Sequence, residues 1–144
     1  TLYEEQVRVP LMVRWPAGLG AGARRREQAV SLVDILPTVR ALLGREPGAQ
    51  GEPLPLADDA PQRERPLYLQ TDRSETPLAA VIEGGWKAVW SVSRGAGPTP
   101  GRLFDLQRDA GEAADLRAEH ADVERRLAEA LQRFESLPPP PAAD

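Results

Sequence analysis

The pattern of apolar and polar positions changes its period three times along the chain. Apolar residues alternate with polar ones near the start, recur at helical spacing around residue 40, and alternate again after residue 66. Near the end of the chain they return to helical spacing. Alternation is typical of a strand with one buried face, and a spacing of three and four is typical of an amphipathic helix. The chain is therefore predicted to mix strands and helices.

The first fifteen residues carry the sharpest strand pattern. Within Leu2–Trp15 the apolar residues fall on alternate positions: Val7, Val9, Leu11, Val13 and Trp15. This pattern predicts a strand with one face in a core, and such a strand needs neighbours on both sides for its backbone groups. One interpretation is that the chain is a piece of a larger protein and that this strand joined it to the rest. The other is an ordinary edge strand, which Pro10 tolerates.

Ser31–Gly44 gives the clearest helix signal of the first half. Asp34 fits the N-cap, with its carboxylate accepting a bond from the first turn, and Gly44 fits the residue after the C-cap. Capping explains Asp34 well enough that a catalytic role is the less favoured interpretation. One apolar face is predicted, consisting of Ile35, Leu36, Val39, Leu42 and Leu43. The proline-rich stretch that follows, residues 45–66, is predicted to be loop.

The second half predicts an antiparallel meander covered by a helix. Period-two segments separated by short polar or Gly-Gly turns indicate four sequential strands. These strands are Leu67–Thr71, Leu78–Glu83, Trp86–Val92 and Arg102–Leu106. A helix is predicted over Glu119–Glu135, and its stripe should pack on one face of the sheet. The stripe consists of Leu116, Val123, Leu127, Leu131 and Phe134.

Composition narrows the classes of function. The net charge is −4 and aromatic residues make up 5%, which argues against nucleic-acid binding. Cysteine is absent, so this chain has no disulfide, no thiolate metal site and no Cys nucleophile. No apolar run reaches the ~20 residues that span a bilayer, so no membrane segment is predicted in this chain.

The chain shows little catalytic equipment. His120 is the single histidine and is interpreted as a surface residue, and no Ser/His/Asp set can be built around it. The adjacent Asp58 and Asp59 lie in a predicted loop without fixed geometry and are interpreted as solvated. We therefore predict no catalytic residue and no metal ligand in this chain.

Three stretches, in order, resemble motifs of the sulfatase family. Leu2–Pro16 resembles the family's L-Y-E-G-G-x-R-V-P segment with the strand after it, and Val33–Thr38 is similar to its V-D-I-L-P-T. Leu103–Leu116 resembles L-Y-D-L-x-x-D-P-x-E-x-x-N-L. This sequence departs from the pattern where Glu5-Gln6 replaces Gly-Gly, where Ala110 replaces Pro, and where Asp115 replaces Asn.

The resemblance implies a fold. Sulfatases have a large α/β domain of the alkaline phosphatase type and a smaller C-terminal domain, in which a four-stranded antiparallel sheet packs on a helix. The chain is thus expected to be an α/β fragment, holding the last strand and helix of the large domain, followed by an α+β unit. Residues 1–66 would end the large domain and form the linker, residues 67–137 would form the small domain, and residues 138–144 a proline-rich tail.

The resemblance also implies a function, the hydrolysis of sulfate esters. The family uses a formylglycine nucleophile and a divalent cation, usually Ca²⁺, both held by residues upstream of these motifs. This chain is therefore expected to be inactive alone and to need a missing N-terminal catalytic portion as its partner. Glu4 and Arg8 are expected at the active-site rim, with Arg8 in a structural ion pair that anchors the strand.

Two other interpretations remain open. The chain is alternatively a non-catalytic binding or scaffold module that has the sheet and helix alone. A third interpretation keeps the fold and makes the intact enzyme a phosphodiesterase or phosphonate hydrolase of the same superfamily. Turnover of aryl sulfates compared with aryl phosphate diesters separates the third interpretation from the first.

Overall fold

A computed structural model describes residues 1–19, 24–48, 50–57, 64–71, 77–93 and 97–136. The chain forms two compact units. The first consists of Thr1–Pro10 and Arg65–Leu137, and the second of Leu11–Glu64 and Pro138–Asp144. No helix in the described part of the chain is long and apolar enough to cross a membrane.

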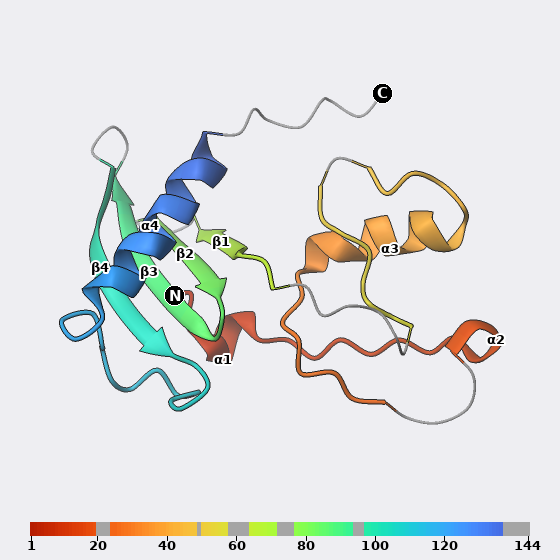
Figure 1. Ribbon diagram of the computed structural model, residues 1–144, viewed down its shortest axis with the longest axis horizontal. Coiled ribbons are helices and arrows are strands. Elements are labelled where there is room, and N and C mark those ends of the chain that lie inside the picture. Colours follow the sequence, from red (N-terminus) through yellow and green to blue (C-terminus); the bar gives the residue numbers. More distant parts are fainter. Residues whose placement is uncertain (20–23, 49, 58–63, 72–76, 94–96, 137–144) are drawn as a thin grey trace. The chain divides into compact units, whose positions relative to one another are not determined.

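The first unit contains the predicted meander (Figure 1). Its four antiparallel strands lie in the order β1-β2-β3-β4. They are β1 (Leu67–Thr71), β2 (Leu78–Glu83), β3 (Trp86–Ser93) and β4 (Gly97–Asp105). Gly84 and Gly85 join β2 to β3 with φ of 59° and 81°. Positive φ at both turn residues suits the twist of a two-residue hairpin, which is why glycine stands there. The meander prediction is confirmed.

Strand β4 begins earlier than predicted. Residues 93–101 were expected to form a loop, but pairing with β3 continues to Ser93 opposite Gly97. The prolines in this stretch are tolerated because β4 is an edge strand, where a missing N–H need not break a ladder. A register shift lies between Val89 and Ser91, opposite Gly101. A Cβ on Gly101 would overlap the carbonyl oxygen of Val89, so only glycine fits this close approach.

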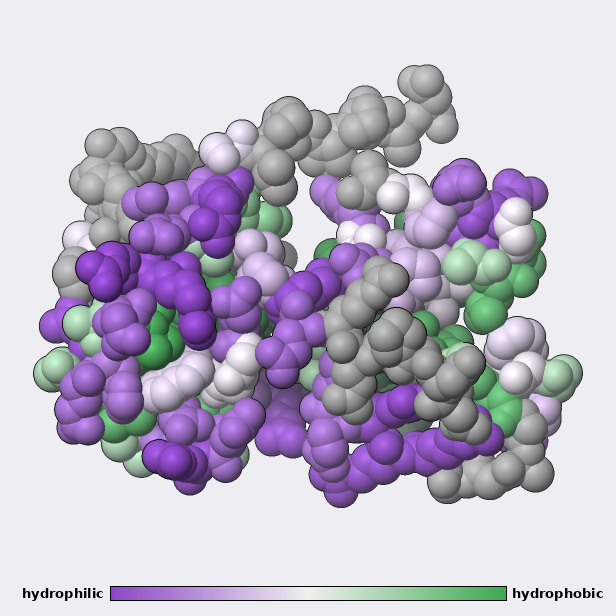
Figure 2. Space-filling view, viewed as in Figure 1, coloured by the Kyte–Doolittle hydropathy of each residue, from purple (hydrophilic) through white to green (hydrophobic). Residues whose placement is uncertain are grey.

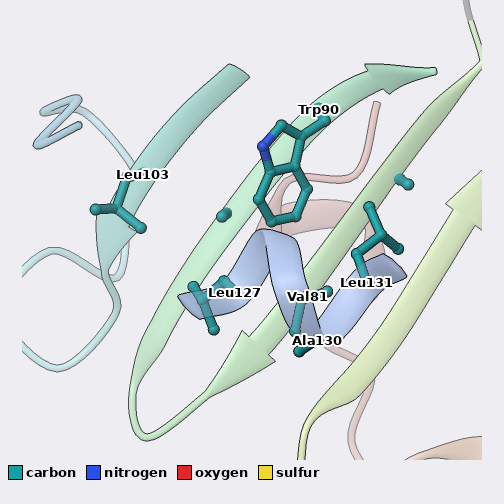
Figure 3. Close-up of a cluster of buried hydrophobic side chains, with 8 residues drawn as sticks. Val81, Trp90, Leu103, Leu127, Ala130 and Leu131 are labelled. Carbon is teal, nitrogen blue, oxygen red and sulfur yellow. The ribbon is translucent and has the colours of Figure 1, made fainter. Parts of the chain in front are cut away.

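Helix α4 (Ala121–Glu135) covers one face of the sheet, as predicted (Figures 1 and 3). The core between them is apolar, and its largest members are Val81, Trp90, Leu103, Leu127 and Leu131. The helix begins two residues later than expected, and Leu116 lies in the segment before it. Phe134 is 41% exposed, but its ring stacks on Tyr68 with 4.1 Å between centroids.

The start of the chain covers the opposite face of the sheet. Strand register places Ile82, Lys87 and Phe104 side by side on that face. The ring of Tyr3 meets Phe104 edge-on at 6.0 Å, and Leu2 is 6% exposed. Residues after Tyr3 form the short helix α1 (Glu4–Val7). The sheet is therefore covered on both faces, whereas the sequence predicted only the α4 cover.

The predicted strand over Leu2–Trp15 is wrong for this structure. Glu4–Val7 is helical, and the residues from Arg8 to Trp15 form neither helix nor strand. Glu5 and Gln6, which replace the family's Gly-Gly, lie within this helix. Glutamate and glutamine have a higher helix propensity than glycine. A strand exists only where a neighbour pairs with it, and none of the described strands pairs with this segment.

The second unit contains α2 (Pro16–Leu19), the 3-10 turn η1 (Leu32–Asp34) and α3 (Ile35–Leu42). Gly44 follows α3 with φ of 66°, as predicted. Asp34 is 2% exposed, but its carboxylate does not cap the first turn of α3. It accepts bonds from the backbone N–H groups of Ser31, at 2.9 Å, and Glu52, at 3.0 Å. Asp34 therefore ties the following loop to the helix start, which is a structural role.

The predicted apolar face of α3 is exposed. Figure 2 shows apolar side chains at the surface in the region of α3. The predicted face of α3 and the turn before it have exposed fractions between 41% and 68%; these residues are Leu32, Val33, Ile35, Leu36, Val39, Leu42 and Leu43. The helical period was thus predicted correctly, but burial of that face within this chain was not found.

Candidate active-site rim

The two expected rim residues occupy different environments. The side chain of Glu4 is 15% exposed and lies at the start of α1. Arg8 follows α1, and its backbone N–H donates to the carbonyl oxygen of Glu4 at 2.9 Å. The side chain of Arg8 is exposed and forms no ion pair with any residue that the structure describes. The anchoring ion pair expected at Arg8 is therefore found at Glu4 instead.

Lys87 of β3 is the partner of Glu4. Its side chain is 0% exposed although it ends in a charge, and its Nζ donates to Oε1 of Glu4 at 3.0 Å. The same Nζ lies 2.9 Å from Oε1 of Glu112. A buried ammonium is tolerated only when it is paired, because it has lost its hydration. We call Glu4, Lys87 and Glu112 the buried charge cluster.

Glu112 completes this cluster from the loop after β4. Its side chain is 2% exposed, and its Oε2 accepts the backbone N–H of Glu4 at 2.5 Å. Its φ is 54°, the one positive value at a non-glycine residue in the described part of the chain. The loop is fixed by carboxylates before and after it, since Oδ2 of Asp109 accepts the N–H of Ala114 at 2.9 Å and Oδ1 of Asp115 accepts that of Leu103 at 3.1 Å. The loop thus holds Glu112 facing both Lys87 and the first residue of α1.

Tyr3 adds a polar contact beside the cluster. Nη1 of Arg102, on β4, donates to the hydroxyl of Tyr3 at 3.0 Å. The aromatic body of Tyr3 packs on Phe104 at the same time. Tyr3 is therefore held by an apolar contact with Phe104 and by a hydrogen bond from Arg102, and the next residue, Glu4, is held by Lys87.

The cluster does not fit the divalent cation that the family resemblance implies. A hard cation such as Ca²⁺ takes six to eight oxygen ligands. Here the two carboxylates that approach each other are already engaged by the ammonium of Lys87. The described residues contain no group of three or more His, Cys, Asp or Glu that could hold a metal ion. The three residues of the buried charge cluster therefore pair with one another and leave neither carboxylate available as a metal ligand.

Sequence reasoning missed two members of the buried charge cluster. Lys87 is the only lysine of the chain and stands between the apolar residues Trp86 and Ala88, and Glu112 is the glutamate of the third matched motif. Both signals were visible, but neither shows what lies opposite the residue. His120 is half-buried, and its ring lies 4.9 Å from that of Trp86. Asp58 and Asp59 lie outside the described residues.

Comparison with known proteins finds similarity to two curated sulfatases. No family model matches the chain. An N-acetylgalactosamine-6-O-sulfatase of Bacteroides thetaiotaomicron is 26% identical, over 90% of this chain and 28% of that protein. A steryl-sulfatase of Mus musculus is 33% identical, over 90% of this chain and 25% of that protein.

The chain thus spans about a quarter of the length of the curated relatives it matches. Both matches extend over most of the chain, and both relatives are sulfatases. They agree with the three motifs found in order along the sequence. The similarity to these two proteins supports the resemblance to a C-terminal portion of sulfatases that the three motifs indicate.

Proposed function

We propose that this chain is the C-terminal part of a sulfatase-like enzyme that hydrolyses sulfate esters and that it is inactive alone. The observation that carries the proposal is the similarity to two sulfatases over 90% of this chain. The names of the two relatives give different substrates, a sugar sulfate and a steroid sulfate, so the shared chemistry is the sulfate ester. The substrate of this protein is proposed only at that level.

The exposed apolar segment from Val9 to Trp15 supports the proposal that this chain packs against a further part of the protein. Val9, Leu11, Val13 and Trp15 keep the period of a strand, yet they are between 39% and 55% exposed. An apolar, strand-patterned segment without a ladder partner is a ready template for pairing with another part of a protein. We propose that residues 1–66 end a large α/β domain of the alkaline phosphatase type, with a linker. Residues 67–137 would then form the small domain, and residues 138–144 a tail.

Arg8 is the residue of this chain that we propose faces the substrate. Its guanidinium is exposed and has no carboxylate partner in the described part, so it is free to meet an anion. Arginine presents a planar set of donors that matches the oxygens of an oxyanion such as a sulfate ester. Glu4 lies one helical turn away, and its carboxylate is occupied by Lys87.

The nucleophile and the metal belong to other residues in this proposal. A divalent cation, when bound in such an enzyme, polarises the ester oxygens, and a formylglycine supplies the attacking oxygen. The cation does not fit the residues described here, because both inward carboxylates are held by Lys87. The formylglycine does not fit either, because the sequence has no cysteine and no S-x-P-x-R motif. The role of this chain is therefore to complete the rim and to hold it in place.

The experiment begins with the reading frame upstream of Thr1. We expect it to encode a C/S-x-P-x-R motif and paired metal-binding aspartates. The longer protein should release the aryl alcohol from an aryl sulfate, and the 144-residue chain should not. A frame without those motifs, or chelator-sensitive turnover by this chain alone, contradicts the proposal.

The same assay decides between the related interpretations. Faster turnover of an aryl phosphate diester than of an aryl sulfate would favour the phosphodiesterase or phosphonate hydrolase. A start codon beside Thr1, together with cooperative unfolding of this chain alone, would favour a binding or scaffold module. The sulfatase proposal expects neither result.

A further inference from the structure

Two of the most deeply buried charged residues have no part in the proposed reaction. Lys87 and Glu112 both belong to the sheet and its loop, and both contact Glu4. Buried ionic groups are weak evidence for stability, because apolar residues of similar volume often pack as well. Their best-attested use is to specify one arrangement among several. The question is which arrangement this cluster specifies.

We propose that Lys87 and Glu112 are positioning residues, which lock Leu2–Val7 on the sheet and thereby fix the place of Arg8 at the active-site rim. The role of Arg8 at the rim rests on the proposed function, whereas the attachment of Leu2–Val7 to the sheet, which we call the lock, does not. The lock is inferred from the contacts that the buried charge cluster makes with the start of the chain.

The lock holds Glu4 at two points. Lys87 binds the carboxylate of Glu4, and Glu112 binds its backbone N–H. Two attachments on one residue fix its orientation as well as its position. The carbonyl oxygen of Glu4 then accepts the N–H of Arg8, so that α1 passes the orientation on by one helical turn. The apolar contact of Tyr3 with Phe104 is less directional and would permit sliding.

The backbone of Glu112 supports this interpretation. A φ of 54° is uncommon for a side chain of this size, because the left-handed region crowds Cβ. Such conformations persist where surrounding contacts over-determine them, and they cluster at functional positions. Here the strained residue is the one whose two carboxylate oxygens reach Lys87 and the start of α1.

The lock is tested on the 144-residue chain by hydrogen exchange with mass spectrometry. Glu4→Gln weakens the grip without changing the sheet sequence, and Lys87→Met keeps an unbranched stem of similar length. We expect each to raise exchange at residues 2–8 at least tenfold, while β2 and β3 keep their protection. Glu129→Gln, exposed on α4, is the matched control and should change nothing. Unchanged protection at residues 2–8, or equal loss of protection in the sheet, overturns the lock.

The positioning of Arg8 is tested in the longer protein with an aryl sulfate. Glu112→Gln should raise KM at least fivefold with kcat within twofold, and Glu129→Gln should leave both unchanged. A purely structural role would lower the active fraction and therefore kcat, so that result overturns positioning, as does an unchanged KM. If the exchange result holds but the wild-type longer protein does not cleave sulfate esters, the proposed function fails and the lock stands. If exchange is unchanged, the lock fails whatever the activity.

Discussion

Leu127→Ala is the sharpest test of how α4 packs on the sheet. Leu127 is 0% exposed and lies in the core with Val81, Trp90 and Leu103 (Figure 3). Truncating a buried leucine costs about 2–5 kcal/mol, because the lost transfer free energy adds to the cost of a cavity. The sheet residues that line this cavity are fixed by their ladders, so collapse is limited. We therefore expect a loss of about 3–4 kcal/mol in the free energy of unfolding of the first unit.

This loss should be plain in both chemical and thermal unfolding. The first unit has about 80 residues, and for that size 1 kcal/mol corresponds to roughly 4–8 °C in Tm. We expect Tm to fall by on the order of 15–25 °C, with a matching fall in the urea midpoint. Fluorescence reports this unit alone if every variant also carries Trp15→Phe, since Trp86 and Trp90 then remain.

The matched control is Leu43→Ala, which removes the same atoms from a side chain that is 68% exposed. It should change the free energy of unfolding by less than ~0.5 kcal/mol. If Leu127→Ala leaves too little folded protein, Leu127→Met keeps the volume and should cost less than ~1.5 kcal/mol. A loss below ~1 kcal/mol for Leu127→Ala would refute the packing of α4 described here.

Three further predictions concern other parts of the chain. Burial raises the pKa of Tyr68 above the ordinary 10.0, so in a Tyr3→Phe background, which leaves Tyr68 as the one tyrosine, absorbance near the tyrosinate maximum should titrate above that value. Because the folded state keeps this proton longer than the unfolded state, stability should fall as pH rises from 10.0 through the folded pKa, and a midpoint at or below 10.0 would contradict this. Gly101→Ala should lower the free energy of unfolding by at least ~2 kcal/mol in urea titration, since its Cβ would overlap a carbonyl, and Gly111→Ala, with 3.7 Å to its nearest neighbour, should change it little. Asp34→Asn should cost the second unit about 1–2 kcal/mol, measured as faster amide exchange in the loop it ties, because the two N–H groups bond different carboxylate oxygens and an amide keeps only one acceptor oxygen.

The sequence by itself determined the local elements of the first unit. The alternation between residues 67 and 106 predicted four strands, and the Gly-Gly pair predicted a tight turn between two of them. The stripe around Leu127 predicted the helix and the face that it buries. These features are readable because neighbouring residues share one environment, so periodicity alone reports it. The three sulfatase motifs are readable for a similar reason, since each is a short contiguous run of residues.

Only the tertiary structure decided what covers the other sheet face and which charges meet there. Lys87 and Glu4 are 83 positions apart, and no periodic pattern links residues at that separation. The tertiary structure also decided that the alternating segment from Val7 to Trp15 forms no strand, since a ladder depends on a partner that no local pattern encodes. The physical reason is the same in both cases: a residue's own sequence neighbours set its local conformation, while its pairing and burial depend on segments far away along the chain.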